Sequence, residues 1–546
     1  MIGCIVVGYH ETEVSGDELE LALAETELIP APVRSLRRTN VGVGGSYRPY
    51  LDALSALYDP RPIGAVYTVA ELPSLGTLYL ANYLRQRGHP AEYVNCFTYE
   101  KDALAELLSQ GPRSVAITTT FYMMPGPVIE IVEFIRQHNA SVPIIVGGPL
   151  VDNYCRAGGQ NRLQRFFERA GGDVYVWESQ GEATLLAVVE ALTGGGELSE
   201  VPNLYLRDSD GTWQLTRRRP EVNNLDQCAV NWSSFDPDRL GGTLSTRTAR
   251  SCAFECAFCD YPERAGALTL ASIDTVEREL EALAAMGTTR VAFVDDTFNV
   301  PMRRFKELCR MMIRRDFGIE WFSYFRCGHA KEPGVYDLMY DAGCRGVLLG
   351  IESGDDSVLR NMDKRATVDD YRFGIEQLRK RDIFTHASFV VGFPGETERT
   401  VQNTIDFLNE TGPDTFAVNH WYYLHSTPIH VRAPQFDLTG SGYTWSHGTM
   451  DSEEALDAAD HIFASVHQAA WMPVNGLDFW GVPYLLGKGM TTKQVTEFLR
   501  LAKPLNPAAR TAPGVTVEAT AEAESRFARF CSALELVPAR YHRTPS

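Results

Sequence analysis

The chain has 546 residues, of which 44% are hydrophobic and 22% charged, a composition typical of a soluble globular protein with more than one domain. Its formal net charge of −19 argues against a nucleic-acid substrate, because proteins that bind nucleic acids normally present a basic surface. No apolar stretch approaches the ~20 residues of a membrane span, and the start of the chain lacks the basic flank of a secretory signal. We therefore predict a cytoplasmic protein with no nucleic-acid partner and no membrane partner.

The first part of the chain, residues 1–195, is predicted to contain a doubly wound sheet. Residues 1–62 show no clear order of elements, but from residue 63 short apolar strands alternate with amphipathic helices. The alternation begins with the strand IGAVYTV at 63–69 and the helix LGTLYLANYLRQRG at 75–88. It predicts a parallel sheet covered by helices on both faces, whose ligands bind at the carboxyl ends of the strands.

The rest of the chain divides into three further predicted parts. Residues 196–240 have the turn signals of a connector with a small hairpin. Residues 241–427 contain six predicted strands separated by five helices, which indicates a partial (β/α)6 barrel with its chemistry at the carboxyl ends of the strands. Residues 428–546 lose this alternation and are predicted to form a mostly helical cap that contributes to the substrate site.

Three cysteines lie close together in the stretch RSCAFECAFCDYPERAG, where Cys252, Cys256 and Cys259 form C-x3-C-x2-C. Cysteine thiolates hold iron–sulfur clusters, and three of them leave one iron of a four-iron cluster with an open coordination position. A structural zinc site is the first alternative, and it needs a fourth ligand such as His420 or His425. Three unrelated buried cysteines are the second alternative.

The context of the cysteine loop resembles the radical S-adenosylmethionine superfamily. The loop follows the first strand of the predicted barrel and carries an aromatic residue, Phe258, before its last cysteine. The resemblance implies a [4Fe-4S] cluster on the three cysteines, with S-adenosylmethionine chelated at the open iron. It also implies an external electron donor of the flavodoxin or ferredoxin type and reductive cleavage to a 5′-deoxyadenosyl radical.

Other predicted strand ends match positions that bind S-adenosylmethionine in this superfamily. The second strand ends in FVDDTFN, where many members have Gly-Gly-Glu, so this position departs from the common pattern. For Asp296 and Ser353 a simple helix cap is the alternative. The resemblance assigns S-adenosylmethionine contacts, in addition to Phe258, to Asp295, Asp296, Arg326, Glu352, Ser353 and Gly392.

The domain ahead of the barrel resembles the cobalamin-binding domain of the cobalamin-dependent branch. The shared features are the helix from residue 75, TTTF at 118–121, GGP at 147–149 and GE at 181–182. The sequence Asp-x-His-x-x-Gly, which supplies a histidine to cobalt, is absent, so we expect cobalamin without that ligand. A degenerate domain without a ligand is the alternative. The resemblance implies that cobalamin contacts Leu75, Gly76, Thr118, Thr119, Thr120, Phe121, Gly147, Gly148, Pro149, Gly181 and Glu182.

The same resemblance implies a methyltransferase similar to C- or P-methylases of antibiotic pathways. Methyl would pass from methylcobalamin to an unactivated carbon, or to phosphorus, of a small-molecule or carrier-bound biosynthetic intermediate. His420, Tyr422 and Tyr423 at the end of the sixth strand are the candidate catalytic residues. The alternatives are a rearrangement, cyclisation or non-radical methyl transfer with the same cofactors, a modifier of nucleic acid or protein, and a non-catalytic corrinoid carrier or sensor.

Overall fold

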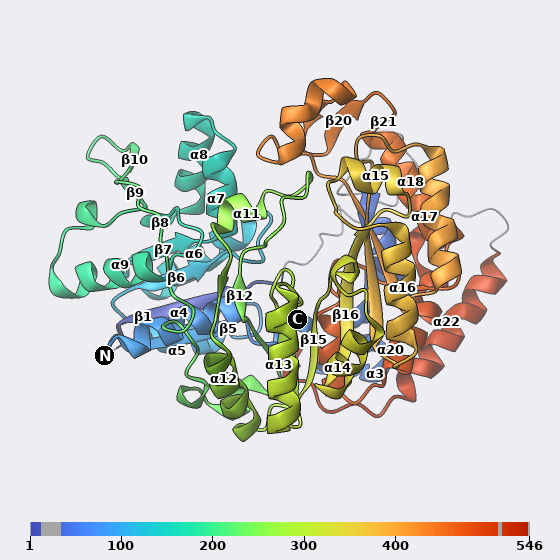
Figure 1. The fold of residues 1–546 in the computed structure, drawn as a ribbon. Helices are drawn as coiled ribbons and strands as arrows, with labels where there is room; N and C mark the ends of the chain where they lie inside the picture. The colour runs from blue at the N-terminus through green and yellow to red at the C-terminus, as the bar shows by residue number, and fades with distance from the viewer. Residues whose placement is uncertain (1, 12–33, 511–515, 544–546) are drawn as a thin grey trace. The chain divides into compact units, whose positions relative to one another are not determined.

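The computed structural model describes residues 2–11, 34–510 and 516–543 (Figure 1). The described chain divides into two compact units. The first unit comprises residues 2–11, 70–241 and 269–286, and the second comprises residues 34–69, 242–268 and the described part of 287–543. None of the helices that the described residues form combines the length and apolar character needed to cross a membrane.

The first unit is built on a seven-stranded sheet whose order is β10-β9-β8-β7-β6-β1-β5. The five strands from β5 to β8 in this order are parallel, and β9 and β10 extend the sheet with antiparallel pairs. Their apolar residues are almost fully buried, as expected for a sheet covered on both faces. The strands are β1 (Cys4–Tyr9), β5 (Ala91–Cys96), β6 (Val115–Thr118), β7 (Ile144–Gly147), β8 (Val174–Val176), β9 (Leu204–Arg207) and β10 (Trp213–Leu215).

Helices follow the parallel strands of this unit, and Ser74 caps the first of them by accepting a hydrogen bond from the backbone N–H of Thr77. A further helix, α12 (Ile273–Ala285), also belongs to this unit. The helices that cover the sheet are α4 (Leu75–Gln86), α5 (Lys101–Ser109), α6 (Gly126–His138), α7 (Pro149–Arg156), α8 (Gln160–Ala170) and α9 (Glu182–Gly194).

The start of this sheet differs from the sequence-based expectation. Strand β1 comes from the segment for which no elements were predicted, and it pairs with both β5 and β6. The run IGAVYTV contributes only β4 (Ala65–Val66), which pairs with β23 (Tyr541–His542) in the second unit. Both runs are short and apolar, and composition alone does not tell which of two such runs occupies a central strand position. The prediction that the sheet begins at residue 63 is wrong.

The second unit is built on a seven-stranded parallel sheet in the order β11-β14-β15-β16-β17-β18-β22. Six strands agree with the predicted ones, and the last, β22, comes from the region expected to be a helical cap. The α/β fold class, with a doubly wound domain ahead of a barrel-like one, is therefore confirmed. The strands are β11 (Thr243–Thr246), β14 (Arg290–Phe293), β15 (Glu320–Tyr324), β16 (Cys344–Glu352), β17 (Phe384–Val391), β18 (Thr415–His420) and β22 (Ala470–Trp471).

Helices lie between successive strands of this sheet along the chain (Figure 1). Capping boxes at Thr367 and Thr397 fix the starts of two of them, α16 and α17. The connecting helices are α13 (Met302–Arg315), α14 (Pro333–Asp341), α15 (Asp356–Asn361), α16 (Val368–Arg379) and α17 (Glu398–Thr411).

The C-terminal region of the second unit packs together with residues 34–69. Trp471 donates its indole N–H to the carbonyl oxygen of Arg38 at 2.8 Å, and Asn506 donates to the carbonyl oxygen of Asn40 at 2.9 Å. The elements here are η1 (Leu36–Arg38), α3 (Tyr50–Tyr58), β19 (Thr439–Ser441), β20 (Thr444–His447), β21 (Met450–Asp451), α18 (Ser452–Ser465), α19 (Gly481–Gly487), α20 (Thr492–Ala502) and α22 (Val517–Ser532). The four-part division of the chain stays a prediction.

Candidate active site

Hydrogen bonds to neighbouring segments hold the cysteine loop in place. Ser251, at a positive φ of 72°, turns the chain out of the strand and donates its hydroxyl to the carbonyl oxygen of Gly266 at 2.6 Å. Within the loop the N–H of Ala257 donates to the carbonyl oxygen of Met362, and the carbonyl of Ala257 accepts from the N–H of Ile429. These bonds anchor the loop on two neighbouring segments. None of its three cysteines forms a disulfide.

All three cysteines line one cavity of about 510 Å³ at the carboxyl ends of the barrel strands, the cysteine cavity. Glu352 of β16, Ser388 of β17 and Asn419 of β18 line the same cavity. Among the described residues, no three His, Cys, Asp or Glu side chains surround one point as they do around a single metal ion. Three thiols on one wall are instead the donor set of an iron–sulfur cluster, and the remaining space accommodates a small polar ligand.

Positive charge lies against the thiols. The Nη1 and Nη2 atoms of Arg326 are 3.8 and 3.9 Å from the Sγ of Cys256, and the guanidinium stacks 3.7 Å above the centre of the Phe254 ring. The same guanidinium donates to the carbonyl oxygen of Lys364. Arg326 therefore places a fixed cation beside one of the three cysteines, Cys256.

A buried ion pair lies on the cavity wall. Lys364 Nζ is 2.8 Å from Glu352 Oε1, and both side chains are at most 10% exposed. Glu352 has a positive φ of 73° at a register shift in β16, and Gly350 leaves room for it, since a Cβ there would lie 2.6 Å from Glu352 Oε1. The local backbone thus turns the carboxylate into the cavity.

The two neighbouring aspartates at the end of β14 have different surroundings. Asp295 is fully buried and accepts hydrogen bonds from the N–H groups of Thr248 and Ala249 and from the Thr248 hydroxyl. It holds the segment that leads into the cysteine loop and does not line the cavity. Asp296 does line the cavity, where burial and then the charge of Asp295 raise its pKa to about 6.

Ser353 and Gly392, two further residues predicted to contact S-adenosylmethionine, form hydrogen bonds within the protein. The Ser353 hydroxyl accepts from the N–H of Asp355 at 3.2 Å. The N–H of Gly392 donates to Glu396 at 2.6 Å, and its carbonyl lies 3.2 Å from His447 Nε2. Neither Ser353 nor Gly392 lines the cysteine cavity, whereas the cysteines and Phe258, Asp296, Arg326 and Glu352 do.

Sequence reasoning missed several cavity residues. Lys364 lies in the link between α15 and α16, and Asp478 and Trp480 come from the C-terminal region. Burial raises the pKa of Asp478 to about 6. No motif or spacing marks these positions, because they reach the cavity from segments outside the strand ends.

A second cavity, of about 400 Å³, adjoins the cysteine cavity, with Phe258, Asn419 and Val474 lining both. His420 and Tyr422 line it, as do Arg38 and Tyr443, which sequence reasoning did not select. Tyr423 does not line it and is 2% exposed, with its hydroxyl 2.7 Å from His430 Nδ1. The three candidate catalytic residues therefore separate into two that line the cavity and one that packs beside it. Trp421, between the first two, lines the cavity as well, so this segment beyond β18 does not alternate strictly.

In the first unit, the threonines and glycines predicted to contact cobalamin meet at the carboxyl ends of β6 and β7. Gly148 has a φ of 108°, and a Cβ there would lie 2.9 Å from Thr119 Oγ1. Thr119 Oγ1 in turn donates to the carbonyl oxygen of Gly147 and accepts from the N–H of Leu150. Thr118 and Thr120 share a hydrogen bond of 3.1 Å.

The surface beside these residues is apolar and open. Phe121 is 52% exposed and stacks on Tyr9 at 4.3 Å, while Met123 and Met124 are 83% and 68% exposed. A Cβ at Gly76, at the start of α4, would lie 3.4 Å from Thr120 Oγ1, and Leu75 and Pro149 flank this region at the first turns of α4 and α7. A close backbone approach next to open apolar surface suits a large macrocycle such as cobalamin.

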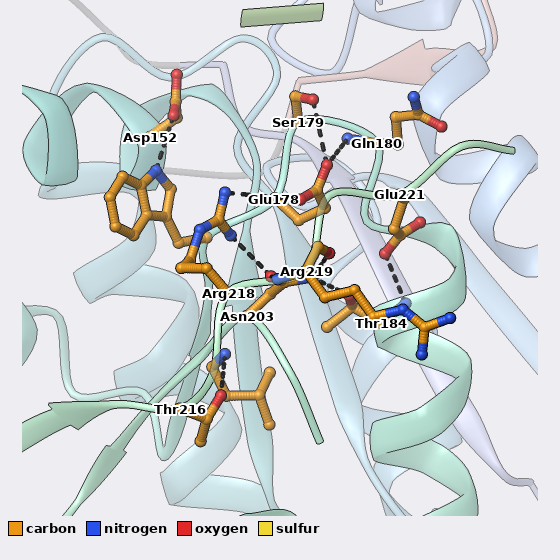
Figure 2. A network of polar contacts seen from close by, with 12 residues as sticks. Asp152, Glu178, Ser179, Gln180, Thr184, Asn203, Thr216, Arg218, Arg219 and Glu221 are labelled. Atoms are coloured by element: carbon orange, nitrogen blue, oxygen red, sulfur yellow. Dashed lines mark hydrogen bonds and ion pairs between the residues drawn. The ribbon is translucent and has the colours of Figure 1, made fainter. Parts of the chain in front are cut away.

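Near the end of β8, Glu182 joins a polar network through Asn223, and Figure 2 shows the part of this network around Glu178, Asn203 and Glu221. Gly181, with a φ of 75°, precedes α9, and Glu182 accepts a hydrogen bond of 2.8 Å from Asn223. Glu221 accepts from the N–H groups of Ala183 and Thr184, so the connector caps this helix.

The same network holds the connector through Arg218. Its guanidinium donates to Asn203 at 3.0 Å and lies 3.6 Å from Glu178, whose pKa is raised by burial and then by Glu221 (Figure 2). The charged groups at this end of the sheet are therefore paired within the unit.

Comparison with protein families identifies both units. Residues 246–408 match the family described as the radical SAM superfamily, and residues 62–157 match the family described as the B12 binding domain. An uncharacterized methyltransferase of Pyrococcus horikoshii is 25% identical over 63% of this chain and 74% of its own length. The anaerobic magnesium-protoporphyrin IX monomethyl ester cyclase of Rubrivivax gelatinosus is 22% identical over 64% of each chain.

Solved structures show the same fold. The radical S-adenosylmethionine methyltransferase TsrM from Kitasatospora setae, with cobalamin and a [4Fe-4S] cluster bound, has 18% sequence identity and a TM-score of 0.55 over 80% of this chain and 75% of its own. The cobalamin-dependent S-adenosylmethionine radical enzyme OxsB, with aqua-cobalamin and S-adenosylmethionine bound, has 19% identity and a TM-score of 0.53 over 64% of this chain and 51% of its own.

The family matches agree with the donor set of the cysteine cavity and with the open Gly- and Thr-lined edge of the first unit. The cofactors are accordingly a [4Fe-4S] cluster, S-adenosylmethionine and cobalamin. The chain therefore combines a region that matches the radical SAM superfamily with one that matches the B12 binding domain, and the proteins similar to it include ones named as methyltransferases.

Proposed function

We propose that this enzyme transfers a methyl group to an unactivated carbon, or to phosphorus, of a small-molecule natural-product intermediate, free or carrier-bound. The observation that carries the proposal is the second cavity, which adjoins the cysteine cavity and has polar and aromatic walls. A substrate there lies next to the place where radical chemistry begins. The similarity to methyltransferases supports methyl transfer as the outcome.

When bound, the cluster with S-adenosylmethionine supplies a one-electron route to hydrogen removal, and cobalamin supplies the methyl group. Cys252, Cys256 and Cys259 would hold the cluster, and Arg326 would lie beside it through its contact with Cys256. The electron donor is of the flavodoxin or ferredoxin type, and the protein acts in the cytoplasm.

The other cavity residues orient S-adenosylmethionine. Asp296 and Glu352 offer carboxylates to its amino group and ribose hydroxyls, and the ammonium of Lys364 holds Glu352 in place. Phe258 lies between two cluster cysteines in the sequence and lines both cavities, so it separates the substrate from the cluster and excludes water.

Product mass tests the proposal. Anaerobically reconstituted protein, given reductant, S-adenosylmethionine, cobalamin and extracts of candidate pathway intermediates, is expected to yield a product heavier than its substrate by one CH2 group, together with 5′-deoxyadenosine. A product without this gain would instead indicate rearrangement or cyclisation, the latter being the activity for which the Rubrivivax gelatinosus relative is named.

Substitution of the three cysteines provides a second test. Replacing Cys252, Cys256 and Cys259 together with Ala should reduce bound iron from about four per chain to background. Formation of 5′-deoxyadenosine should stop, while cobalamin stays bound, because the cysteines and the cobalamin residues belong to different units. Iron retained in this variant, or cobalamin lost from it, would contradict the assignment.

A further inference from the structure

The second cavity contains a single formal charge among its described lining residues, the guanidinium of Arg38. No carboxylate lines it within the described part of the chain. Arg38 precedes the predicted sheet and barrel in the sequence, in a segment for which no elements were predicted, and it reaches the cavity from the short helix η1.

Arg38 is 4% exposed, and its ion pair with Asp460 uses only one of its nitrogen atoms. Its Nη1 donates to Asp460 Oδ1 at 2.5 Å. No hydrogen bond within the described residues uses its Nε or Nη2. These two atoms are not among the fully buried atoms that lack a partner, so they remain able to donate to a ligand in the cavity.

Of the charged groups around Asp460, only Arg38 lines the cavity. The Asp460 carboxylate also accepts from Arg34 Nη2 at 2.9 Å, and Arg34 pairs with Asp457 as well, so the two arginines are matched by two aspartates outside the cavity. Arg34 does not line the cavity. Burial and then the charge of Arg38 lower the pKa of His420 to about 4, so this ring adds no charge near neutral pH.

Aromatic rings form much of the wall, beside neutral polar residues and valines. His420 stacks on Tyr443 with ring centres 5.4 Å apart, and Trp421 and Trp471, which are at most 3% exposed, line the same cavity. Rings that exclude water strengthen an ionic hydrogen bond in the same cavity. They also offer a flat apolar surface to the body of a ligand.

We propose that the second cavity is the substrate pocket and that Arg38 recognises an oxyanion of the substrate, a carboxylate or a phosphorus oxyanion, while the apolar part of the substrate packs on His420 and Tyr443. This assignment rests on the proposed function and narrows its substrate class to small organic anions. Phe258 and Asn419, which line both cavities, place the bound anion beside the cysteine loop.

Binding of simple probes tests the assignment without turnover. The probes are phenylacetate and phenylphosphinate, which carry the two kinds of oxyanion, and phenylacetamide as their neutral counterpart. Their dissociation constants are measured by ligand-observed NMR on the reconstituted full-length protein. The variants are Arg38→Gln, Arg38→Lys and, as the matched control, Arg34→Gln, which loses the same ion-pair network without lining the cavity.

We expect wild-type protein to bind at least one of the two anions about tenfold more tightly than the amide, the factor expected from hydrogen bonds to a charged group. Arg38→Gln should abolish this preference, and Arg34→Gln should keep it. Arg38→Lys should bind the anion severalfold more weakly than wild type, because an ammonium lacks the parallel N–H pair of a guanidinium. The preferred anion distinguishes a carboxylate from a phosphorus oxyanion.

Three results would overturn the assignment: no preference for an anion in wild type, unchanged preference in Arg38→Gln, or an equal loss in Arg34→Gln, which indicates a structural role. If Arg38→Gln does not fold, Arg38→Lys decides, since it keeps the Asp460 pair, and wild-type affinity in it counts against the proposal. Product mass tests methyl transfer separately, so either proposal can fail alone.

Discussion

The two parallel sheets present different kinds of carboxyl edge. In the first unit the edge consists of glycines, threonines and exposed apolar side chains, and the charged Glu182 is already hydrogen-bonded within the unit. In the second unit the edge carries buried charged groups that face one cavity, among them Arg326, Glu352 and Lys364.

This difference corresponds to the two classes of cofactor. A large macrocycle is held through shape and close backbone approach, for which small residues are suited. S-adenosylmethionine carries an amino group, a carboxylate and a sulfonium, so its site needs charged partners placed in an enclosed space. Variants that alter backbone shape should therefore affect the first unit, and variants that alter buried charge should affect the second.

The largest effect is expected at the buried pair of Glu352 and Lys364. Glu352→Gln leaves the Lys364 ammonium buried without its partner, which typically costs about 3 kcal/mol of folding free energy. The dissociation constant for S-adenosylmethionine should rise at least about tenfold, because a charge-assisted contact is lost. Thermal unfolding and equilibrium binding of S-adenosylmethionine measure the two effects.

An exposed pair serves as the matched control. Arg372 and Glu410 form an ion pair with side chains 41% and 57% exposed, and Glu410→Gln should cost less than about 1 kcal/mol. The double variant Glu352→Gln, Lys364→Met should regain most of the stability without regaining ligand affinity. If affinity returns as well, the pair is structural and does not contact the cofactor.

A smaller effect, confined to cobalamin, is expected at Gly148. Gly148→Ala places a Cβ 2.9 Å from the Thr119 hydroxyl and disturbs the hydrogen bonds that join β6 to the start of α7. We expect cobalamin to bind about tenfold more weakly, which corresponds to about 1.4 kcal/mol. Bound iron should not change. Cobalamin absorbance after gel filtration and iron analysis check both statements.

Gly158→Ala is the control for alanine at a positive φ without a collision. Gly158 also has a positive φ, 71°, but a Cβ there meets nothing within 4 Å. Both variants place alanine at a positive φ. Gly148→Ala has the larger backbone cost, because φ 108° with ψ −168° is a conformation essentially restricted to glycine, and it also adds the contact with Thr119. Equal loss of cobalamin in both would mean that the loop, rather than its close approach, determines binding.

Sequence reasoning found the parts of the site that follow local rules. The cysteine spacing predicted the thiols of one cavity, and strand ends placed Arg326 and Glu352 beside them. It did not separate Asp295 from Asp296, because both follow the same strand and only the fold shows which one turns inward.

The remaining site residues depend on contacts between distant segments. Lys364 reaches the cysteine cavity from a link between helices, and Arg38 reaches the second cavity from a region without recognisable elements. Strand β1 was missed for a related reason, since its central position depends on pairing with β5 and β6 rather than on its own composition. Such pairings are not encoded in local periodicity.

The smallest expected effect is a pH dependence of stability at Glu396, whose carboxylate accepts from the N–H of Gly392 on the charged edge of the second unit. Burial raises the pKa of Glu396 to about 7. Its pKa is higher in the folded than in the unfolded protein, so the folded state holds the proton longer and loses stability as pH rises towards about 7. Glu396→Gln has no such proton to lose.

We therefore expect the stability of wild type, relative to Glu396→Gln, to fall by about 1 kcal/mol between about pH 6 and pH 7 and to level off above. Unfolding midpoints measured from about pH 6 to pH 8 stay above the isoelectric point of about 5.2. Glu398→Gln, an exposed change two residues away, should show no such trend. If the difference in stability between wild type and Glu396→Gln does not change with pH, the Gly392 N–H fully stabilises the buried carboxylate. Burial of the Glu396 charge would then not reduce the free energy of unfolding.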